Sequence, residues 1–362
     1  MNTPQHFESH YDSIVVGAGP AGTMAARHAA ARGRVLLVDS SSLPRDKSCG
    51  GMLNEYSQEF LAEYGEMPEA LWLEPRWVNF RYHDWDRKIR KPTELRFLNV
   101  DRRGFDEWLT SLLPEHVTMI GETSVSGFEQ ADGGVRVSLK QNGAEQTVTC
   151  SYLIGADGPR SSVRRQLGVG SVSTYVTLQD FCTVDGPIEP YFDCIYMRDV
   201  GDEFGYAYVV PKGDVAIIGS VFYPKTKRPH VKHDQVMATL REALPLGESQ
   251  KREAWIALQV CDRGDVMPGD GRVLLAGEAG GFMSPTSGEG ISYALNTGRL
   301  AGLAVAESQN GSGLSAYRES TAHISSNISR KLKWLPFMQS RTGKYLAGFV
   351  PTPIVSRITK GL

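Results

Sequence analysis

Three glycines, Gly17, Gly19 and Gly22, have the spacing that a dinucleotide-binding turn requires. They follow the short apolar run 11–16, which reads as a buried parallel strand, and a helical pattern begins directly after them. The first glycine permits a tight turn, the second lets the backbone approach a pyrophosphate, and the third lets the helix pack closely on the strand. Unpaired N–H groups at the start of that helix would then face the phosphates.

A second apolar run, residues 34–38, stops at Asp39, 22 residues after Gly17. A carboxylate at this distance can bond ribose hydroxyls. Strand, glycine turn, helix, strand and acid therefore predict a dinucleotide site, and Pro20 and Ala21 inside the turn are typical of a flavin dinucleotide.

Three further turns repeat this theme. Residues 152–156 run into Asp157, residues 272–276 run into Gly277 and Glu278, and a third turn contains Cys49. Glycine-rich turns after apolar strands put backbone N–H groups at the carboxyl edge of a sheet, where ligands bind in open α/β folds. Each has a plainer interpretation: an ordinary Asp-Gly turn, a small buried thiol at Cys49, and a solvated surface lysine at Lys47.

Together these motifs are similar to those of the geranylgeranyl reductase family of FAD-dependent oxidoreductases, within the p-hydroxybenzoate-hydroxylase-like flavoprotein superfamily. The motifs, which span residues 11 to about 300, are GAGPAG, PxxKxCGG, the helix start Arg102-x-x-Phe105-Asp106, GADGPRSSVRR and GEAGGFMSPTSGEGI. The resemblance implies an α/β fold, with a Rossmann-type FAD-binding domain, an interleaved antiparallel-sheet substrate domain and a C-terminal helical segment.

The resemblance also implies the cofactor contacts. The pyrophosphate would lie on the first turn, the adenosine ribose at Asp39, and adenine at the backbone of Val125. The isoalloxazine ring would lie along Cys49, and the ribityl chain would bond Glu278, which stands where most relatives have Asp. The expected cofactor-binding residues are Gly17, Ala18, Gly19, Pro20, Ala21, Gly22, Asp39, Ser40, Cys49, Gly50, Gly51, Arg102, Val125, Asp157, Gly277, Glu278, Gly288, Gly290 and Ile291.

Residues 172–258 alternate apolar and polar side chains, which favours an antiparallel sheet. In the superfamily such a sheet forms the floor of the substrate cavity. Tyr206-x-Tyr208-x-Val210-Pro211 resembles the YxWxFP segment of geranylgeranyl reductases, with Tyr in place of Trp and Val in place of Phe, so a reshaped cavity is expected. Cys49, Tyr206 and Tyr208 are the candidate catalytic residues, and ordinary sheet core is the alternative for the two tyrosines.

Signals for other chemistry are weak. His230-x-x-His233 has ligand-like spacing, but no cysteine or acid cluster stands near it, so we expect a surface loop and no metal site. A GxSxG motif and the WxWxIP segment of flavin halogenases are absent. There is no second GxGxxG, so NAD(P)H or another reductant is expected to dock transiently as electron donor.

The segment 330–362 carries seven basic residues and no acidic one, interleaved with aromatic and aliphatic side chains. Such a pattern suits a helix lying on an anionic membrane surface. The alternative, which we favour, is a helical cap on the cavity with a solvated basic face. The remaining residues, 1–329, have a net charge of −9, although the whole chain of 362 residues has only −2.

Composition and charge exclude some classes of protein. A near-zero net charge argues against a generally basic nucleic-acid binder. Five scattered cysteines favour a reduced compartment, and the first residues lack the pattern of a signal peptide. We expect a cytoplasmic protein, peripheral to the membrane if the basic segment binds there, with a hydrophobic or aromatic small-molecule substrate.

The expected organisation is a discontinuous FAD-binding domain (11–70, 100–170 and 260–325), a substrate sheet domain (71–99 and 171–259) and a C-terminal basic amphipathic segment (326–362). The leading functional hypothesis is hydride transfer from reduced flavin to a C=C bond of a hydrophobic substrate. Two alternatives remain open: a monooxygenase that hydroxylates an aromatic substrate through a flavin hydroperoxide, and a non-catalytic flavin-binding partner protein.

Overall fold

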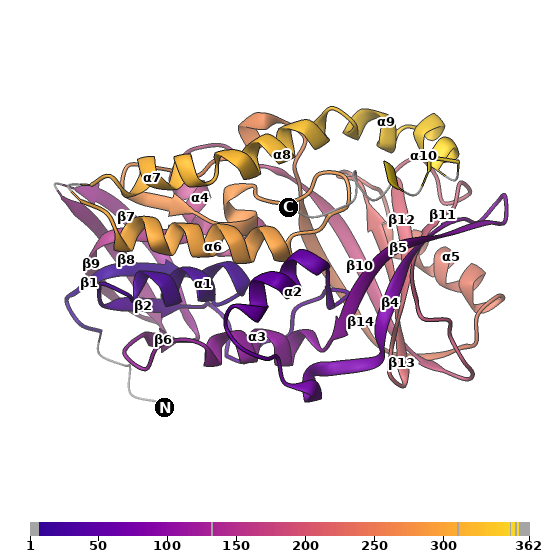
Figure 1. The fold of residues 1–362 in the computed structure, drawn as a ribbon, viewed down its shortest axis with the longest axis horizontal. Helices are drawn as coiled ribbons and strands as arrows, with labels where there is room; N and C mark the ends of the chain where they lie inside the picture. The colour runs from indigo at the N-terminus through magenta and orange to yellow at the C-terminus, as the bar shows by residue number, and fades with distance from the viewer. Residues whose placement is uncertain (1–6, 132, 310, 348, 352, 355–362) are drawn as a thin grey trace.

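The protein contains two eight-stranded sheets that lie side by side, with helices packed against both (Figure 1). The computed structural model describes residues 7–131, 133–309, 311–347, 349–351 and 353–354. The residues 348, 352 and 355–362 of the predicted C-terminal segment, which include Arg357 and Lys360, lie outside the described residues.

The first sheet has the order β15-β16-β9-β1-β2-β6, and β7 and β8 continue from β9. Parallel pairing joins β16, β9, β1, β2 and β6, whereas β7, β8 and β15 pair antiparallel. Its strands are β1 (His10–Val16), β2 (Val35–Val38), β6 (Thr118–Ile120), β7 (Thr123–Ala131), β8 (Gly134–Gln141), β9 (Ala144–Gly155), β15 (Gly269–Asp270) and β16 (Val273–Leu275).

The second sheet has the order β14-β10-β13-β12-β11-β4-β5-β3. It is antiparallel, as expected, except at β11 and β4, which pair parallel. These two strands come from separate stretches of the chain, and no hairpin fixes their relative direction. The strands are β3 (Met52–Leu53), β4 (Trp72–Asp84), β5 (Ile89–Val100), β10 (Ser173–Val184), β11 (Tyr191–Tyr196), β12 (Phe204–Lys212), β13 (Val215–Phe222) and β14 (Leu246–Gln259).

The helices are short apart from α5 and α6. They are α1 (Pro20–Ala29), α2 (Glu55–Ala62), α3 (Arg102–Ser111), α4 (Ser162–Gln166), α5 (Pro229–Arg241), α6 (Ile291–Ala306), α7 (Gly313–Ser320), α8 (Ala322–Leu332), α9 (Leu335–Gln339) and α10 (Arg341–Ala347). Four 3₁₀ turns are η1 (Glu69–Leu71), η2 (Gly158–Arg160), η3 (Arg263–Asp265) and η4 (Gly277–Gly280). No helix in the described residues is both long enough and apolar enough to cross a membrane.

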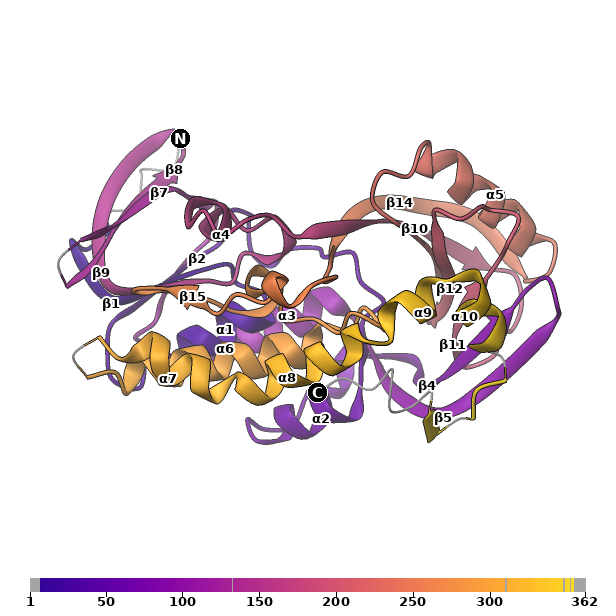
Figure 2. The same ribbon diagram turned by 90° about the horizontal axis from the view of Figure 1, so that it is seen from above.

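The first sheet is buried on both faces, as its continuous apolar strands predict. Val15 packs toward α1, α6, α7 and α8, whereas its neighbours Ile14 and Val16 pack toward the β7–β8–β9 side. Figure 2 shows α6, α7 and α8 together on one side of this sheet. Side chains of a strand alternate between faces, so one strand supplies both cores.

The second sheet has one face covered and one face open to a cavity. Val209 on β12 packs with α5 in one core, whereas Tyr208 and Val210 belong to a separate cluster on the opposite face. The same period-two alternation therefore separates the structural face of this sheet from the face that lines the candidate site.

Candidate functional site

One cavity of about 1840 Å³ runs from the glycine turn after β1, past the edge of the second sheet, to α9 and α10. Every predicted cofactor-binding residue lines it except Ala18 and Gly22, and so do Tyr206 and Tyr208. The structure thus brings together side chains from the first, second and C-terminal parts of the chain.

The three glycines of the first turn have different physical roles. Gly17 has φ +101°, and a Cβ there would overlap the carbonyl oxygen of Ala156. A Cβ on Gly22 would overlap the carbonyl oxygen of Gly17. At Gly19 the nearest atom is a side-chain nitrogen of Arg45, 3.0 Å from an added Cβ. Gly17 and Gly22 are therefore needed for close packing. Because Gly19 has no side chain, the backbone of the turn is exposed to the cavity at this position.

Asp39 lies next to this turn, lines the cavity and is only 6% exposed. Its carboxylate accepts hydrogen bonds from the backbone N–H groups of Ala18 (2.8 Å) and Ser41 (2.9 Å). The Nε of Arg45 is 3.4 Å from the same carboxylate. Asp39 therefore holds the glycine turn against the next loop as well as facing the cavity.

Arg45 is a residue of this site that the sequence analysis missed. Its Nε is buried and has no hydrogen-bond acceptor in the described structure, and one Nη lies beside Gly19. The Asp39 carboxylate, 3.4 Å from this Nε, balances part of the charge, and the other N–H groups of the guanidinium can donate to an anionic ligand. The bare glycine turn and this guanidinium fit a dinucleotide pyrophosphate. The only sequence signal was the position of Arg45 in the segment that ends in Cys49-Gly50-Gly51.

Lys212 anchors the loop that contains Cys49, Gly50 and Gly51. Its Nζ donates to the carbonyl oxygens of Gly51 (3.0 Å) and Val100 (2.9 Å), and the residue is only 7% exposed. Burial lowers the pKa of Lys212 to about 7, with the charges of Cys49 and Asp101 acting in the opposite direction. Lys212 follows the Tyr206–Pro211 pattern on β12, and no motif marked it.

Lys47 does not behave as the solvated lysine that was expected, and that expectation was wrong. Its side chain is 17% exposed, its Nζ is 3.8 Å from a carboxylate oxygen of Glu278, and it lies 4.7 Å from the centre of the Trp255 ring. Burial lowers the pKa of Lys47, whereas the charge of Glu278 raises it. The other oxygen of Glu278 accepts from the backbone N–H of Leu258 at 3.1 Å. Glu278 therefore joins η4, β14 and the Cys49 loop.

Two further predicted positions lie on the opposite wall. Arg102 begins α3 and donates through Nε to Asp106 at 2.8 Å. Asp157 accepts from the Ser161 hydroxyl (2.5 Å) and from the backbone N–H of Ser162 (2.6 Å). Asp157 thereby fixes the start of α4, whereas α3 is capped by Asp101, whose side chain accepts from the N–H of Gly104.

The turn before α6 completes this end of the cavity. Gly288 has φ +67°, and the Tyr206 hydroxyl lies 3.7 Å from where its Cβ would stand. Gly290 is the N-cap of the 16-residue helix α6. The N-terminus of α6 therefore lies at the cavity beside Tyr206, and the Glu289 carboxylate accepts from the backbone N–H of Ser292 at 2.7 Å.

The second sheet supplies an aromatic chamber. Its wall includes Phe80, Phe97, Tyr175, Phe192, Tyr206, Tyr208 and Tyr223. Gln179, which is 1% exposed, donates to the Tyr208 hydroxyl and accepts from the hydroxyl of Ser48 in the Cys49 loop. Burial raises the pKa of Tyr206 well above its ordinary value and also raises that of Tyr208, so both hydroxyls keep their protons near neutral pH.

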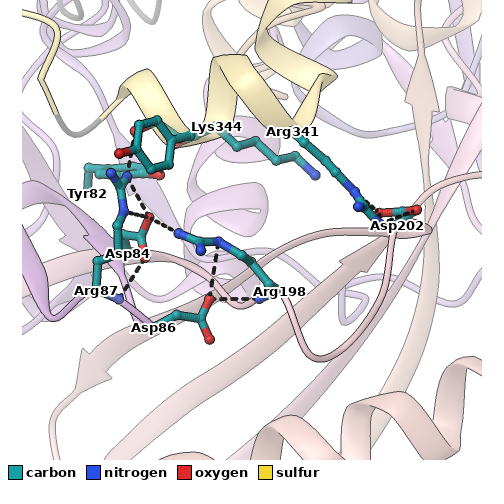
Figure 3. A network of polar contacts seen from close by, with 9 residues as sticks. Tyr82, Asp84, Asp86, Arg87, Arg198, Asp202, Arg341 and Lys344 are labelled. Atoms are coloured by element: carbon teal, nitrogen blue, oxygen red, sulfur yellow. Dashed lines mark hydrogen bonds and ion pairs between the residues drawn. The ribbon is translucent and has the colours of Figure 1, made fainter.

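The C-terminal helices close the chamber, and Figure 3 shows part of their attachment. The Tyr82 hydroxyl donates to the backbone carbonyl of Lys344 at 2.7 Å, and Arg87 donates to that of Tyr345. The Nζ of Lys344 donates to the carbonyl of Phe204 at 2.9 Å. We call residues 334–354, so far as they are described, the lid.

His233 was wrongly expected on a surface loop. It lies on α5, is fully buried, and is 2.8 Å from the hydroxyl of Ser220 through Nδ1. Asp180 stands 3.7 Å from its Nε2. Burial lowers the pKa of His233 to about 4, so it is neutral. Ser220 is itself fully buried and does not line the cavity described above, so this triad-like group is part of the core. The apolar face of α5 required burial, which the local sequence did not show.

Comparisons with known proteins agree with this geometry. A family described as "FAD binding domain" matches residues 109–332, and one described as "FAD dependent oxidoreductase" matches residues 12–159. Protein CbrA of Escherichia coli O1:K1 / APEC is 28% identical over 302 residues, covering 80% of each chain.

Two solved structures share the fold. A geranylgeranyl bacteriochlorophyll reductase-like protein from Thermoplasma acidophilum has a TM-score of 0.78 at 19% identity, covering 98% of this chain and 93% of that one. The flavin-dependent brominase Bmp2 has a TM-score of 0.75 at 17% identity, covering 97% and 93%. The chain belongs to the FAD-binding domain family and is an FAD-dependent oxidoreductase.

Proposed function

We propose that this protein reduces a C=C bond of a hydrophobic substrate, with FAD as its cofactor. The observation that carries the proposal is the continuous cavity, which joins the bare glycine turn to an aromatic chamber closed by the lid. When bound, FAD in its reduced form supplies the hydride. One alkene carbon gains that hydride, and the other gains a proton.

The residues around the Cys49 loop favour the reduced, negatively charged form of the cofactor. Lys47, paired with Glu278, and Arg102, paired with Asp106, bring cationic side chains to this region, and Lys212 adds a third positive charge below its pKa of about 7. Their charges lie in a largely buried site, where fixed charges act more strongly than in water. The N-terminus of α6 adds the positive end of a helix dipole, which the Glu289 carboxylate partly offsets by accepting from the N–H of Ser292.

Tyr206 is positioned to handle the proton. Its hydroxyl faces the turn at Gly288, at the boundary between the glycine-rich end of the cavity and the aromatic chamber. Its raised pKa keeps a proton on the oxygen, and no hydrogen-bond partner for this hydroxyl is found in the described structure. We assign Tyr206 the role of proton donor to the second alkene carbon, after which water restores the proton. Cys49 and Tyr208 line the same space and would orient the substrate.

The proposal is tested by a single turnover without oxygen. FAD-loaded protein is reduced with dithionite and mixed with geranylgeraniol as an alkene probe. The expected result is return of the yellow oxidised flavin and a product heavier by two hydrogens. A product that forms only in air and is heavier by one oxygen would establish the monooxygenase instead. The physiological donor, NAD(P)H or another transiently docking reductant, is identified by the loss of the yellow absorbance of oxidised flavin when each donor is added in turn.

A further inference from the structure

The outer surface of the lid is unusually apolar for a water-exposed surface. Nine large hydrophobic side chains are exposed in the described residues, and six of them lie in the lid. These six, which we call the lid patch, are Trp334, Phe337, Tyr345, Leu346, Phe349 and Ile354. Single exposed apolar residues are ordinary on protein surfaces, whereas a cluster of them marks an interaction site.

The lid patch stays outside because the lid backbone is fixed to the second sheet. Tyr82, Arg87 and Lys91 donate to backbone carbonyls of residues 344, 345 and 350. Arg87 also lies over the rings of Tyr345 (3.8 Å) and Phe349 (5.3 Å). Figure 3 shows Arg87 between Asp84 and the lid. These bonds use main-chain atoms of the lid, and the side chains of Tyr345, Leu346 and Phe349 remain exposed.

The charges near the lid patch have one predominant sign. Arg330, Lys333 and Arg341 are exposed, and residues 330–362 contain no acid. Arg341 pairs with Asp202. On the facing strand, Lys91 and Arg96 line the cavity together with a single acid, Glu94. Aromatic side chains beside lysine and arginine are the pattern of proteins that bind the interface of an anionic bilayer.

The lid patch is continuous with the cavity. Trp334, Phe337 and Ile354 are exposed and also line the cavity, so they form part of its rim. A hydrophobic molecule that left a bilayer at this rim would reach the aromatic chamber without crossing bulk water. Avoiding that crossing removes the cost of exposing its apolar surface.

We propose that the lid patch docks on the surface of a bilayer that contains anionic lipids, and that the substrate is a lipid drawn from that bilayer. The proposal that the lid patch docks on a membrane is argued from the exposed residues alone. The proposal that the substrate is a lipid from that bilayer rests on the proposed function.

Docking is tested by co-sedimentation of the FAD-loaded protein with phosphatidylcholine vesicles, with and without phosphatidylglycerol. We expect binding to the anionic vesicles that weakens as salt is raised. The double variant F337S/F349S should bind at least roughly tenfold more weakly, because each lost ring removes apolar contact with the interface. The matched control is Val231→Ser on α5, which changes a residue 61% exposed, as Phe349 is at 62%, and should not alter binding.

A second variant separates the electrostatic contribution. Lys333→Glu should weaken binding to anionic vesicles roughly tenfold and leave binding to pure phosphatidylcholine unchanged. Equal binding of wild type and all lid variants would overturn the proposal. So would a concentration-dependent dimer, seen by analytical ultracentrifugation, that F337S/F349S converts to monomer, because the lid patch would then be an interface between two copies.

Vesicle binding requires no turnover, so its failure is distinguishable from failure of the proposed reaction. The substrate half is tested by embedding geranylgeraniol in the vesicles and following flavin reoxidation. The variant L346S/F349S, whose two residues are exposed and do not line the cavity, should slow reoxidation with the embedded alkene and leave it unchanged with a short, water-soluble alkenol. An equal loss with both probes would contradict delivery from the bilayer.

Discussion

Lys212 and Gly51, 161 residues apart in the chain, are joined by a 3.0 Å hydrogen bond from a buried ammonium to a backbone carbonyl. The bond connects the last residue of β12, in the second sheet, to the loop that carries Cys49. No salt-bridge partner of Lys212 is found within the described structure, and its second acceptor is the carbonyl of Val100. A buried cation held only by carbonyls is sensitive to pH.

This arrangement predicts a pH dependence of stability. The pKa of Lys212 is lowered from 10.5 to about 7. Between these values the unfolded lysine keeps its proton while the folded one has lost it, so the unfolded state binds more protons. The free energy of unfolding should therefore rise with pH above about 7, by about 1.4 kcal/mol per pH unit from this group. Urea unfolding of Lys212→Met should show a slope smaller by that amount, whereas Lys140→Met, on the exposed side of β8, should match the wild type.

Gly19→Val should abolish FAD binding. The added side chain would project where the second glycine lets a backbone approach pyrophosphate. Only the flexible end of Arg45 stands near an added Cβ, so the variant should still fold. Gly127→Val is the control, because no atom lies within 4 Å of its Cβ. Yellow, stoichiometric FAD retained by Gly19→Val would sink the assignment of this turn.

Lys47→Met should make the reduction potential of bound FAD more negative. Removing a buried positive charge beside the Cys49 loop disfavours the reduced, anionic form. The expected change is roughly 30 mV, which corresponds to about 1.4 kcal/mol for a two-electron couple. Lys251→Met, at an exposed lysine paired with Asp46 and Glu253, should leave the potential unchanged. A shift of equal size in both variants would mean that Lys47 acts only through overall charge.

Tyr208→Phe and Tyr206→Phe should have opposite profiles. Losing the Tyr208 hydroxyl leaves the buried amide of Gln179 without that acceptor, which should lower the free energy of unfolding by about 1–3 kcal/mol. Tyr206→Phe removes a hydroxyl that has no hydrogen-bond partner in the described residues, so stability should be nearly unchanged. Its rate of alkene reduction should fall roughly 100-fold or more, as for a lost proton donor. Thermal unfolding and single-turnover rates measured on both variants check this pair.

Local sequence was enough to predict the first sheet and its glycine turns. The pattern around Gly17 and Asp39 lies within one stretch of chain, and strand period, turn glycines and helix start all act locally there. The match to an FAD-binding domain and the fold shared with the reductase-like structure confirm the fold class.

Environments set by distant residues could not be predicted in the same way. Lys47 looked like a surface lysine because Glu278 and Trp255 reach it from more than 200 positions away. Arg45 and Lys212 carried no motif, since their roles depend on where two sheets meet. His233 appeared polar and exposed, but Ser220 and Asp180 enclose it.

The Cys49 loop is held by β12 at two separate positions. Ser48 is tied to Tyr208 through Gln179, and Gly51 is tied to Lys212, four residues further along the same strand. A single bond would allow the loop to pivot, but two bonds fix both its place and its orientation relative to the chamber wall. A substrate that displaces the Tyr208 side chain should therefore also displace the Cys49 loop, which is expected to lie beside the flavin ring. We therefore expect a substrate in the chamber to shift the reduction potential of bound FAD through the contacts from Tyr208 to Gln179 and from Gln179 to Ser48.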